Sequence, residues 1–324
     1  MIVVALWLGA GALFCENALR GNRRDLSAKW LDVVGGHAAT DVEMTAADGA
    51  ILRATYVRAD RSRDCVLVLH GISDSRVGSL GFAPMFVDAG YSVLAPDSRA
   101  HGLSGGDLVT YGLLEVGDVL RWAEWLHKRG CQELYGLGES MGGSILIQAA
   151  AQQTVFGAIV AECPFSDLPS IAEYRVVQWM HGRMPARIVA RSLVSSALVY
   201  ARVRYGLSLR SASPVEGAAR LRTPLLLIHG TEDANVPPAH SQAIAKADPK
   251  AEMWFVEGAG HTGAAARDPV QFRSRVLGWF QGHSVTRNRP RPRAVRWVRP
   301  CGSLLTAACG TPGAASRVAW WAPW

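Results

Sequence analysis

A serine with the surroundings of a catalytic nucleophile lies at residue 140, in the centre of the G-x-S-x-G pattern at residues 138–142. The residues before it, 133–137, form a short apolar run typical of a buried strand, and residues 144–152 have helical spacing. In this context the pattern predicts a sharp strand-to-helix turn that exposes the hydroxyl of Ser140. A serine hydroxyl is a weak nucleophile, so this chemistry requires a general base, an acid that orients the base, and donors for an oxyanion.

The acid and the base are expected further along the chain, in that order. Asp233 follows an apolar run in TPLLLIHGTEDANVP, and we expect it to orient the base. Glu232 and Asp167 are the alternatives for this role. His261 follows the last apolar run, in MWFVEGAGH, and precedes a helical pattern over 268–280, so it is the predicted general base.

Backbone amides are the expected donors for the oxyanion. The amide of Met141 directly follows the nucleophile, and the amide of Ile72 follows an earlier strand in VLVLHGISDS. Gly71 lets this loop approach the serine closely. We interpret His70 as a hydrogen-bonded organiser of the loop in preference to a proton-transfer group.

A second polar segment, VLAPDSRAHGLSGG, places Asp97, Arg99 and His101 close together after the next strand. Such a cluster could hold a metal, but no further histidine or carboxylate lies at ligand spacing. We therefore interpret the segment as a buried, ion-paired loop that supports the nucleophile. The predicted chemistry requires no metal and no cofactor.

The chain has 324 residues, of which 49% are hydrophobic, and a formal net charge of +7. Seven of its 34 basic residues lie in residues 284–324, which contain no acidic residue, so the other 27 balance the 27 acidic residues. No nucleic-acid surface is expected on a neutral body of this kind. The six cysteines show neither a C-x-x-C pair nor zinc spacing, and we expect them to be reduced and mostly buried.

The order of apolar runs predicts an α/β fold. Continuous apolar runs alternate with helical patterns, which is typical of a parallel sheet covered on both faces; the runs are 66–69, 91–95, 134–137, 158–161, 225–228 and 253–256. Alternating segments at 41–45 and 51–57 predict an antiparallel start. We expect a mostly parallel sheet of about eight strands, flanked by helices.

The predicted organisation has four parts. Residues 1–19 are apolar and are followed by arginines, which predicts a membrane anchor with the domain on the cytoplasmic face; the alternative is a cytoplasmic protein with this helix packed on its domain. Residues 20–40 are expected to be a linker and 41–283 the catalytic domain, with a helical cap at about 168–210. The basic Pro- and Arg-rich tail, 284–324, is expected to be disordered and without a catalytic role.

Several of these segments together resemble the landmarks of a known enzyme group; they are HGIS, DSRAHGLSGG, GLGESMGG, HGTEDANVP and GAGH. They are similar to those of α/β-hydrolases of the monoacylglycerol lipase and serine-aminopeptidase-like branch, over residues 41–280. The resemblance implies a triad on Ser140, Asp233 and His261 below a cap. Ala100 departs from the family, which usually has glycine at this position.

The expected function is hydrolysis of small-molecule carboxylic esters, with acyl or lipid-derived groups, through an acyl-enzyme. A peptidase or amidase for small residues and a thioesterase are alternatives on the same triad. An acidic cluster in the cap would favour the peptidase, and only Glu173 is present there. A non-catalytic binding protein on the same fold is a third possibility.

Overall fold

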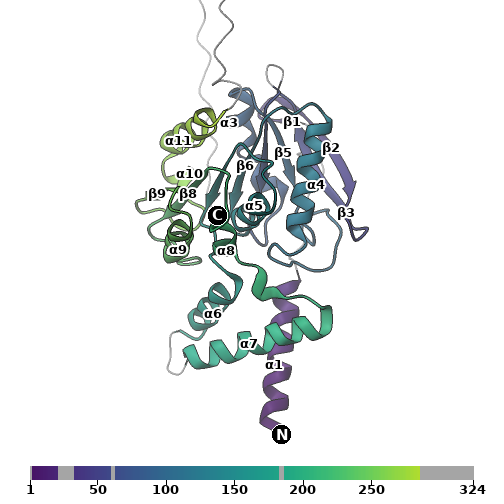
Figure 1. Ribbon diagram of the computed structural model, residues 1–324, viewed down its shortest axis with the longest axis vertical. Coiled ribbons are helices and arrows are strands. Elements are labelled where there is room, and N and C mark those ends of the chain that lie inside the picture. Colours follow the sequence, from purple (N-terminus) through teal and green to yellow (C-terminus); the bar gives the residue numbers. More distant parts are fainter. Residues whose placement is uncertain (1, 21–32, 60–62, 182–185, 285–324) are drawn as a thin grey trace, which may run out of the picture. The chain divides into compact units, whose positions relative to one another are not determined.

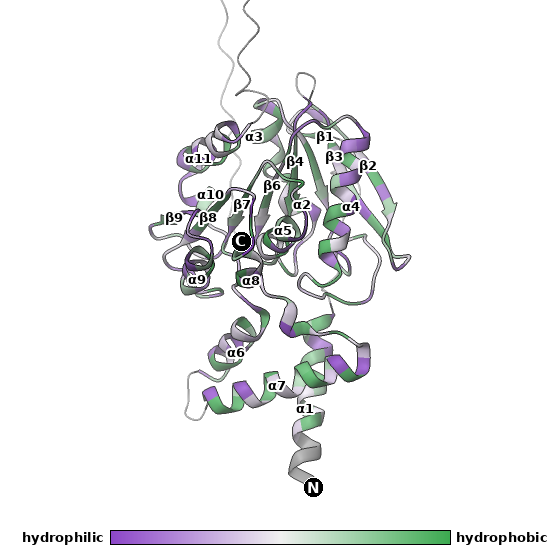
Figure 2. Ribbon diagram, in the orientation of Figure 1, coloured by the Kyte–Doolittle hydropathy of each residue, from purple (hydrophilic) through white to green (hydrophobic). Residues whose placement is uncertain are grey.

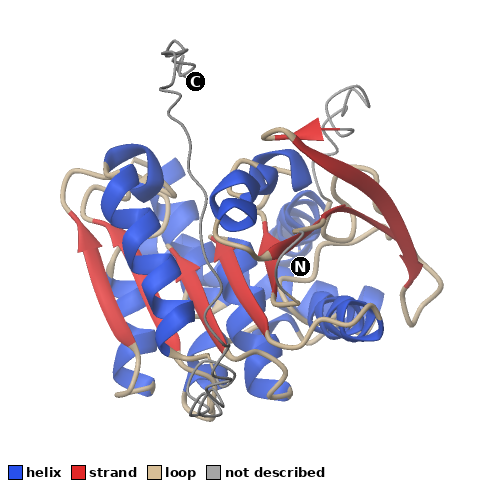
Figure 3. Cartoon of the chain, turned by 90° about the horizontal axis from the view of Figure 1, so that it is seen from above, coloured by secondary structure: helices blue, strands red, loops and turns tan. Residues whose placement is uncertain are grey.

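The computed structural model describes residues 2–20, 33–59, 63–181 and 186–284. Within these ranges the chain forms one nine-stranded sheet (Figures 1 and 3). The strands are Val33–Val34 (β1), His37–Thr45 (β2), Ile51–Val57 (β3), Cys65–Leu69 (β4), Ser92–Pro96 (β5), Leu134–Glu139 (β6), Ala158–Glu162 (β7), Leu225–Gly230 (β8) and Glu252–Val256 (β9). The predicted basic tail lies outside the described residues, apart from Ser284.

The sheet has the order β1-β2-β3-β5-β4-β6-β7-β8-β9. The β1–β2, β2–β3 and β3–β5 pairs are antiparallel, and every pair from β5 to β9 is parallel. The predicted fold class, a mostly parallel sheet with an antiparallel start, is confirmed. Because β4 and β6 to β9 are parallel, their carboxyl ends meet at one edge, where ligands bind in open α/β sheets.

Helices cover both faces of the sheet (Figure 3). The helices are Ile2–Leu19 (α1), Arg76–Leu80 (α2), Ala83–Asp88 (α3), Glu115–Lys128 (α4), Met141–Gln152 (α5), Leu168–Trp179 (α6), Ala186–Tyr205 (α7), Pro214–Ala218 (α8), Ala239–Ala247 (α9), Ala264–Arg267 (α10) and Pro269–Gly282 (α11). On β4, Val66 and Val68 join the core with α3 and α11, whereas Leu67 and Leu69 join the core with α4 and α5. Two covered faces explain the continuous apolar strands.

Two helices, α6 and α7, occupy the segment predicted as a cap, and we call this pair the cap. They pack on each other and lie apart from the helices that flank the sheet (Figure 1). Along α7 hydrophobic and hydrophilic residues alternate (Figure 2). Ala190, Val194 and Ala201 are buried, whereas Val199 and Val203 are exposed. One side of α7 therefore packs on neighbouring helices and the other is exposed.

Helix α1 crosses α7 and packs against it (Figure 1), and its residues Cys15 and Leu19 are buried in the core. Its carboxyl end is bound to the domain, because the hydroxyl of Tyr111 donates to the carbonyl of Ala18 and the amide of Val109 donates to that of Leu19, both at 2.7 Å. None of the described helices is long and apolar enough to cross a membrane. The structure thus gives the predicted anchor no support and matches the alternative, a helix packed on the domain.

The sheet begins earlier than the sequence indicates. Strands β1 and β2 start at Val33 and His37, inside the predicted linker 20–40, and β2 pairs with β3 from Ala39 onward. The side chains of β2 are exposed or only partly buried, so its sequence lacks the apolar run that marks the inner strands. The linker boundary predicted at residue 40 is therefore wrong.

Two of the cysteines expected to be reduced form a disulfide instead. Cys65 begins β4 and Cys131 shortly precedes β6, and their Cα atoms lie 6.0 Å apart across 66 residues of sequence. The parallel pairing of β4 with β6 brings them together, a contact that spacing along the chain cannot reveal. Among the described cysteines, Cys15 and Cys163 are free and buried.

An ion-paired arginine fixes the loop that follows β5. Arg99 donates from Nε and Nη2 to the two carboxylate oxygens of Asp118 on α4, at 2.7 and 2.9 Å. Its Nη1 donates to Asp48, in the β2–β3 turn, at 2.8 Å. Arg99 and Asp118 are buried, so each charge depends on the other for compensation.

We expect Arg99→Ala to lower the free energy of unfolding by about 3 kcal/mol, because it leaves the buried carboxylate of Asp118 without its cation. The matched control is Arg53→Ala, which removes an exposed pair with Glu43 at 3.3 Å and should cost less than about 1 kcal/mol. Urea unfolding of both variants provides the measurement. Equal losses in the two would show that the Arg99 pairs do not stabilise the fold.

Candidate active site

Ser140 lies in the sharp turn between β6 and α5. Its backbone has φ 50° and ψ −115°, a conformation that non-glycine residues rarely adopt. Its amide donates to the carbonyl of Glu162 at 2.7 Å, and its own carbonyl accepts from the amide of Ser144 at 3.1 Å. These bonds hold the strained turn at the carboxyl edge of the sheet.

Glycines on both sides of Ser140 are required by close backbone contacts. A Cβ atom at Gly138 would lie 2.5 Å from the backbone of Gly142 and Gly143. One at Gly142 would lie 2.6 Å from the carbonyl oxygen of His70. Any larger residue would therefore push α5 away from β4 and β6, and the turn with it.

The side chains of Ser140, His261 and Asp233 form a chain of hydrogen bonds. His261 Nε2 lies 2.9 Å from Ser140 Oγ, and His261 Nδ1 lies 2.7 Å from Asp233 Oδ2. The three residues follow the parallel strands β6, β9 and β8, whose carboxyl ends bring them together. The arrangement can remove a proton from the serine hydroxyl while a carboxylate orients the imidazole.

The carboxylate of Asp233 is buried and accepts several hydrogen bonds. Oδ1 accepts from the amides of Asn235 and Val236 at 2.8 and 2.9 Å, and Oδ2 also lies 3.3 Å from His229 Nε2. Burial by itself raises the pKa of Asp233, but the hydrogen bonds from His229, His261 and Val236 outweigh it. The pKa is therefore held well below its ordinary value, and Asp233 is ionised at neutral pH.

Neither alternative acid lies beside His261. Glu232 is exposed. Asp167 caps the first turn of α6, where its carboxylate accepts from the amide of Ser170 at 2.8 Å.

The loop after β4 passes directly beside Ser140. A Cβ atom at Gly71 would lie 3.3 Å from Ser140 Cβ, and both Ile72 and Met141 line the same cavity as Ser140. Met141 is the first residue of α5, so its N–H has no carbonyl partner within the helix. Two amides close to the nucleophile can stabilise a negative oxygen.

His70 is buried behind this loop. Its Nδ1 donates to the carbonyl of Gly71 at 2.7 Å, and its Nε2 accepts from the amide of Ser98 at 2.9 Å. Burial lowers the pKa of His70 to about 3, so the ring is neutral. A neutral ring with both nitrogens engaged holds the β4 loop against the β5 loop.

The other two residues of the polar segment are also buried. Asp97 accepts from the amides of Arg76 and Leu103 at 2.8 and 2.9 Å, and its carboxylate pairs with the Arg76 side chain at 3.5 Å. His101 Nδ1 donates to the carbonyl of Arg99 at 2.9 Å. Together with the Arg99 pairs, these contacts fix the loop next to the β4 loop.

Two further polar residues contact the site, and the sequence analysis did not single them out. His229, at the end of β8, is fully buried, and its ring contacts Ser241 Oγ at 2.7 Å and the carbonyl of Val236 at 2.8 Å. Glu162 ends β7 and accepts from the amide of Ala264 at 2.9 Å. An ionisable residue at the end of an apolar strand was the available signal for both.

Glu162 is fully buried next to His261 and Asp233. Burial is the main cause that raises the pKa of Glu162, to about 7. Its contact with Ala264 fixes the segment that follows His261. The carboxyl group is therefore partly protonated at neutral pH while it holds the histidine loop.

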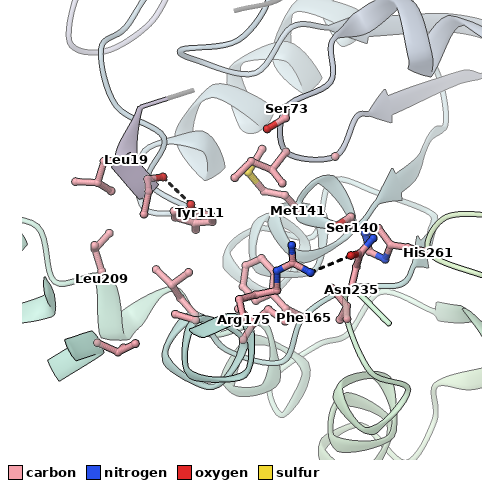
Figure 4. Close-up of a pocket in the computed structure, with 18 of the residues that line it drawn as sticks. Leu19, Ser73, Tyr111, Ser140, Met141, Phe165, Arg175, Leu209, Asn235 and His261 are labelled. Atoms are coloured by element: carbon pink, nitrogen blue, oxygen red, sulfur yellow. Dashed lines mark hydrogen bonds between the residues drawn. The ribbon is translucent and has the colours of Figure 1, made fainter. Parts of the chain in front are cut away.

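A cavity of about 630 Å³ opens beside Ser140 and His261 (Figure 4). Its volume is typical of small-molecule sites. Polar groups come from the 71–74 loop, Glu139, Arg175 and Asn235. Apolar side chains from three helices line the rest, and they include Phe14, Ala18 and Leu19 of α1, Leu168, Ile171 and Ala172 of α6, and Val194, Ala197 and Leu198 of α7.

The cap is attached to the loop that carries Asp233. Arg175 Nη1 on α6 donates to Asn235 Oδ1 at 2.9 Å (Figure 4), and the side chains of Tyr174 and Gln178 donate to the carbonyl of Ala234 at 3.1 and 2.9 Å. These bonds tie one side of the cap to the acid loop.

Among the described residues, one trio has the side chains and proximity to hold a metal ion. It consists of Cys163, His229 and Asp233, whose ligand atoms lie within 4.8 Å of one another. Burial raises the pKa of the Cys163 thiol far above its ordinary value, and a metal requires the thiolate. The His229 ring and the Asp233 carboxylate are engaged in the hydrogen bonds described above, so the donor set is poorly suited to a metal.

We expect Glu162→Gln to flatten the pH dependence of stability. A carboxyl whose pKa rises on folding binds more protons in the folded than in the unfolded state. The contribution of Glu162 to stability therefore falls as pH rises from about 4.5 to 7, by at most about 1.4 kcal/mol per pH unit. The glutamine keeps the acceptor for Ala264 and does not titrate. Urea unfolding between pH 5 and 8 tests this; a constant difference between the two proteins at every pH would contradict it.

Comparison with known proteins agrees with this architecture. Residues 79–286, well over half of the chain, match the prolyl oligopeptidase family. The chain is 27% identical over 234 residues to the uncharacterized protein YqkD of Bacillus subtilis (strain 168). This alignment covers 70% of this chain and 74% of YqkD. It is 30% identical over 108 residues to a thermostable monoacylglycerol lipase of Bacillus sp. (strain H-257), or 33% of this chain and 43% of the lipase.

Solved structures with the same fold include the esterase Pf2001 of Pyrococcus furiosus. It superposes with a TM-score of 0.65 at 22% identity and covers 81% of this chain and 98% of the esterase. The expected membership of the α/β-hydrolase superfamily is therefore confirmed. The chain is a hydrolase of the α/β-hydrolase type and belongs to the prolyl oligopeptidase family.

Proposed function

We propose that this protein is a serine hydrolase that cleaves carboxylic esters of apolar acyl groups through a covalent acyl-enzyme. The observation that carries the proposal is the hydrogen-bond chain from Ser140 through His261 to Asp233 at the wall of a mostly apolar cavity. Each side chain then has one role: Ser140 is the nucleophile, His261 the general base and acid, and Asp233 the group that orients His261.

The reaction begins with attack of Ser140 Oγ on the ester carbonyl carbon, while His261 Nε2 takes the hydroxyl proton. The carbonyl π electrons move to the oxygen, which becomes the oxyanion. The C–O bond to the alcohol then breaks, and His261 returns its proton to the leaving alkoxide. Water, deprotonated by the same nitrogen, then attacks the acyl carbon. The bond between this carbon and Ser140 Oγ breaks, and His261 returns the proton to Oγ, which releases the carboxylic acid and restores the Ser140 hydroxyl.

The amides of Ile72 and Met141 are our candidates for the oxyanion hole. Their loop and helix end both lie next to Ser140, and neither amide must move a side chain to act. Fixed backbone donors of this kind stabilise charge that develops only in the transition state. The neutral His70 and the buried Arg99 pairs support the proposal, because they make the two adjacent loops rigid.

A peptidase is the second candidate, because the chain belongs to the prolyl oligopeptidase family. A peptidase that holds a free amino terminus needs an ionised carboxylate in its pocket. Burial raises the pKa of Glu139, which lines the cavity, to about 8, so it is mostly neutral at pH 7. Glu173 in the cap faces Arg191 at 3.8 Å. Asp74 also lines the cavity, so a peptidase would place the amino terminus of its substrate there. The predominantly apolar lining favours the ester substrate.

Labelling with a fluorophosphonate probe tests the nucleophile. We expect wild type to gain one covalent adduct at Ser140, detected by mass spectrometry, and Ser140→Ala to gain none. Ser274→Ala, which removes an exposed hydroxyl on α11, is the matched control and should be labelled like wild type. Folded wild-type protein that takes no label would contradict the proposal and favour a binding protein on this fold.

Substitution of the acid tests the rest of the chain. We expect Asp233→Asn to lower kcat for p-nitrophenyl butyrate by about 10³ to 10⁴, because the amide cannot stabilise the imidazolium of His261. The neighbouring exposed Glu232→Gln should stay within about twofold of wild type. If Asp233→Asn retains turnover within a few-fold, Asp233 is not the acid that orients His261.

The substrate class is tested with two series of chromogenic compounds. We expect hydrolysis of p-nitrophenyl esters and at most weak hydrolysis of alanyl and prolyl p-nitroanilides. Faster cleavage of an anilide than of every ester would instead assign the peptidase function.

A further inference from the structure

Helix α1 forms the end of the cavity that is farthest from the nucleophile. In Figure 4, Leu19 of α1 and Leu209 lie on one side of the cavity, His261 lies on the other, and Ser140 lies between them. Phe14, Cys15, Ala18 and Leu19 all line this space. Residues 14–19 lie outside the matched family region, which begins at residue 79.

Two sets of contacts hold α1 in place. The carboxylate of Glu16 accepts from the hydroxyls of Tyr200 and Tyr205 on α7 at 2.8 and 2.5 Å. The first of the causes that lower the pKa of Glu16 to about 2 is the bond from Tyr205, so the carboxylate is ionised at neutral pH. With the bonds to Ala18 and Leu19, these contacts bind α1 to the cap and to the domain.

The two helices also approach each other closely at Gly11. A Cβ atom there would lie 2.6 Å from Ser196 Cβ and 3.0 Å from the amide nitrogen of Ala197. A Cβ atom at Gly9, two residues earlier and exposed, would meet no atom within 4 Å. The α1–α7 contact therefore depends on a small residue at one position of α1.

The position of His261 determines which part of an ester can face α1. His261 must protonate the leaving alcohol, so the alcohol lies on the His261 side of Ser140. Tyr111 and Leu19 lie on the side of Ser140 away from His261 (Figure 4), and this is the side that remains for the acyl group. The lining at that end is apolar, which suits a hydrocarbon chain.

We propose that α1 is the end wall of the acyl pocket and sets the maximum acyl chain length, with Phe14 and Ala18 as the residues that determine specificity. This inference rests on the proposed ester hydrolysis. The predicted substrate therefore has an unbranched or lightly branched aliphatic acyl group, and the terminal methyl of this group contacts α1.

The test compares the chain-length profile of kcat/KM for p-nitrophenyl esters from acetate to dodecanoate. Each methylene that loses its apolar contact should cost about fourfold. We expect Ala18→Phe to reduce kcat/KM for the longest ester accepted by wild type at least tenfold and to leave acetate within threefold. Phe14→Ala should move the optimum toward longer chains. Leu13→Ala removes an α1 side chain that is 75% exposed and should retain the wild-type profile.

The opposite shifts in Ala18→Phe and Phe14→Ala cannot both arise from partial unfolding. If wild type hydrolyses esters and all three variants share its profile, α1 does not limit the acyl pocket, while the proposed function stands. Binding of dodecanoate, measured by calorimetry with butyrate for comparison, tests the wall without turnover. If wild type hydrolyses no ester, the proposed function fails. Dodecanoate binding that is weakened only by Ala18→Phe would then still support α1 as the end wall of the cavity. Equal dodecanoate binding in all variants would overturn this role of α1.

Discussion

The left-handed backbone of Ser140 is the constraint on which the rest of the site depends. This positive φ belongs to the sharp turn by which β6 passes into α5. The carbonyl of Glu162 holds the strained turn through its hydrogen bond to the Ser140 amide. Gly138 and Gly142 have no side chain, which lets the backbones of β4, β6 and α5 come into contact around the turn. The strained backbone of Ser140 lowers the free energy of unfolding, and the packing of the surrounding sheet between its helices offsets this cost. The same carbonyl belongs to a residue whose side chain holds the histidine loop, so nucleophile and base share one support.

Above the edge of the sheet, the chain encloses an apolar space from three directions. The cap is bonded to the acid loop through Arg175, and α1 is bonded to the cap through Glu16. The polar chemistry is confined to one end of this space and hydrocarbon lines the other. Such a division matches a substrate with one reactive polar group and one apolar arm, and it links the amino-terminal helix to the selection of that arm.

The sequence was sufficient for the succession of the inner strands and for the juxtaposition of Ser140, Asp233 and His261, because strand ends in a parallel sheet meet at one edge. It was insufficient where contacts join distant segments with no local pattern. The Cys65–Cys131 disulfide and the burial of α1 against α7 depend on tertiary packing. Apolar content alone made α1 resemble an anchor. The faces of β2 are mostly exposed, so no apolar run marks its first residues. A glutamate at the end of a strand is usually at the surface, so the sequence does not indicate the buried position of Glu162.

The central claim is that Ser140, prepared by His261 and Asp233, attacks an acyl carbonyl whose oxygen is received by two backbone amides. A crystal structure of the protein after reaction with an alkyl fluorophosphonate tests it most directly. The account predicts phosphorus bonded to Ser140 Oγ, a phosphoryl oxygen within hydrogen-bond distance of the amides of Ile72 and Met141, and His261 still beside Asp233. Phosphorus on another residue, or a phosphoryl oxygen directed away from both amides, would contradict it.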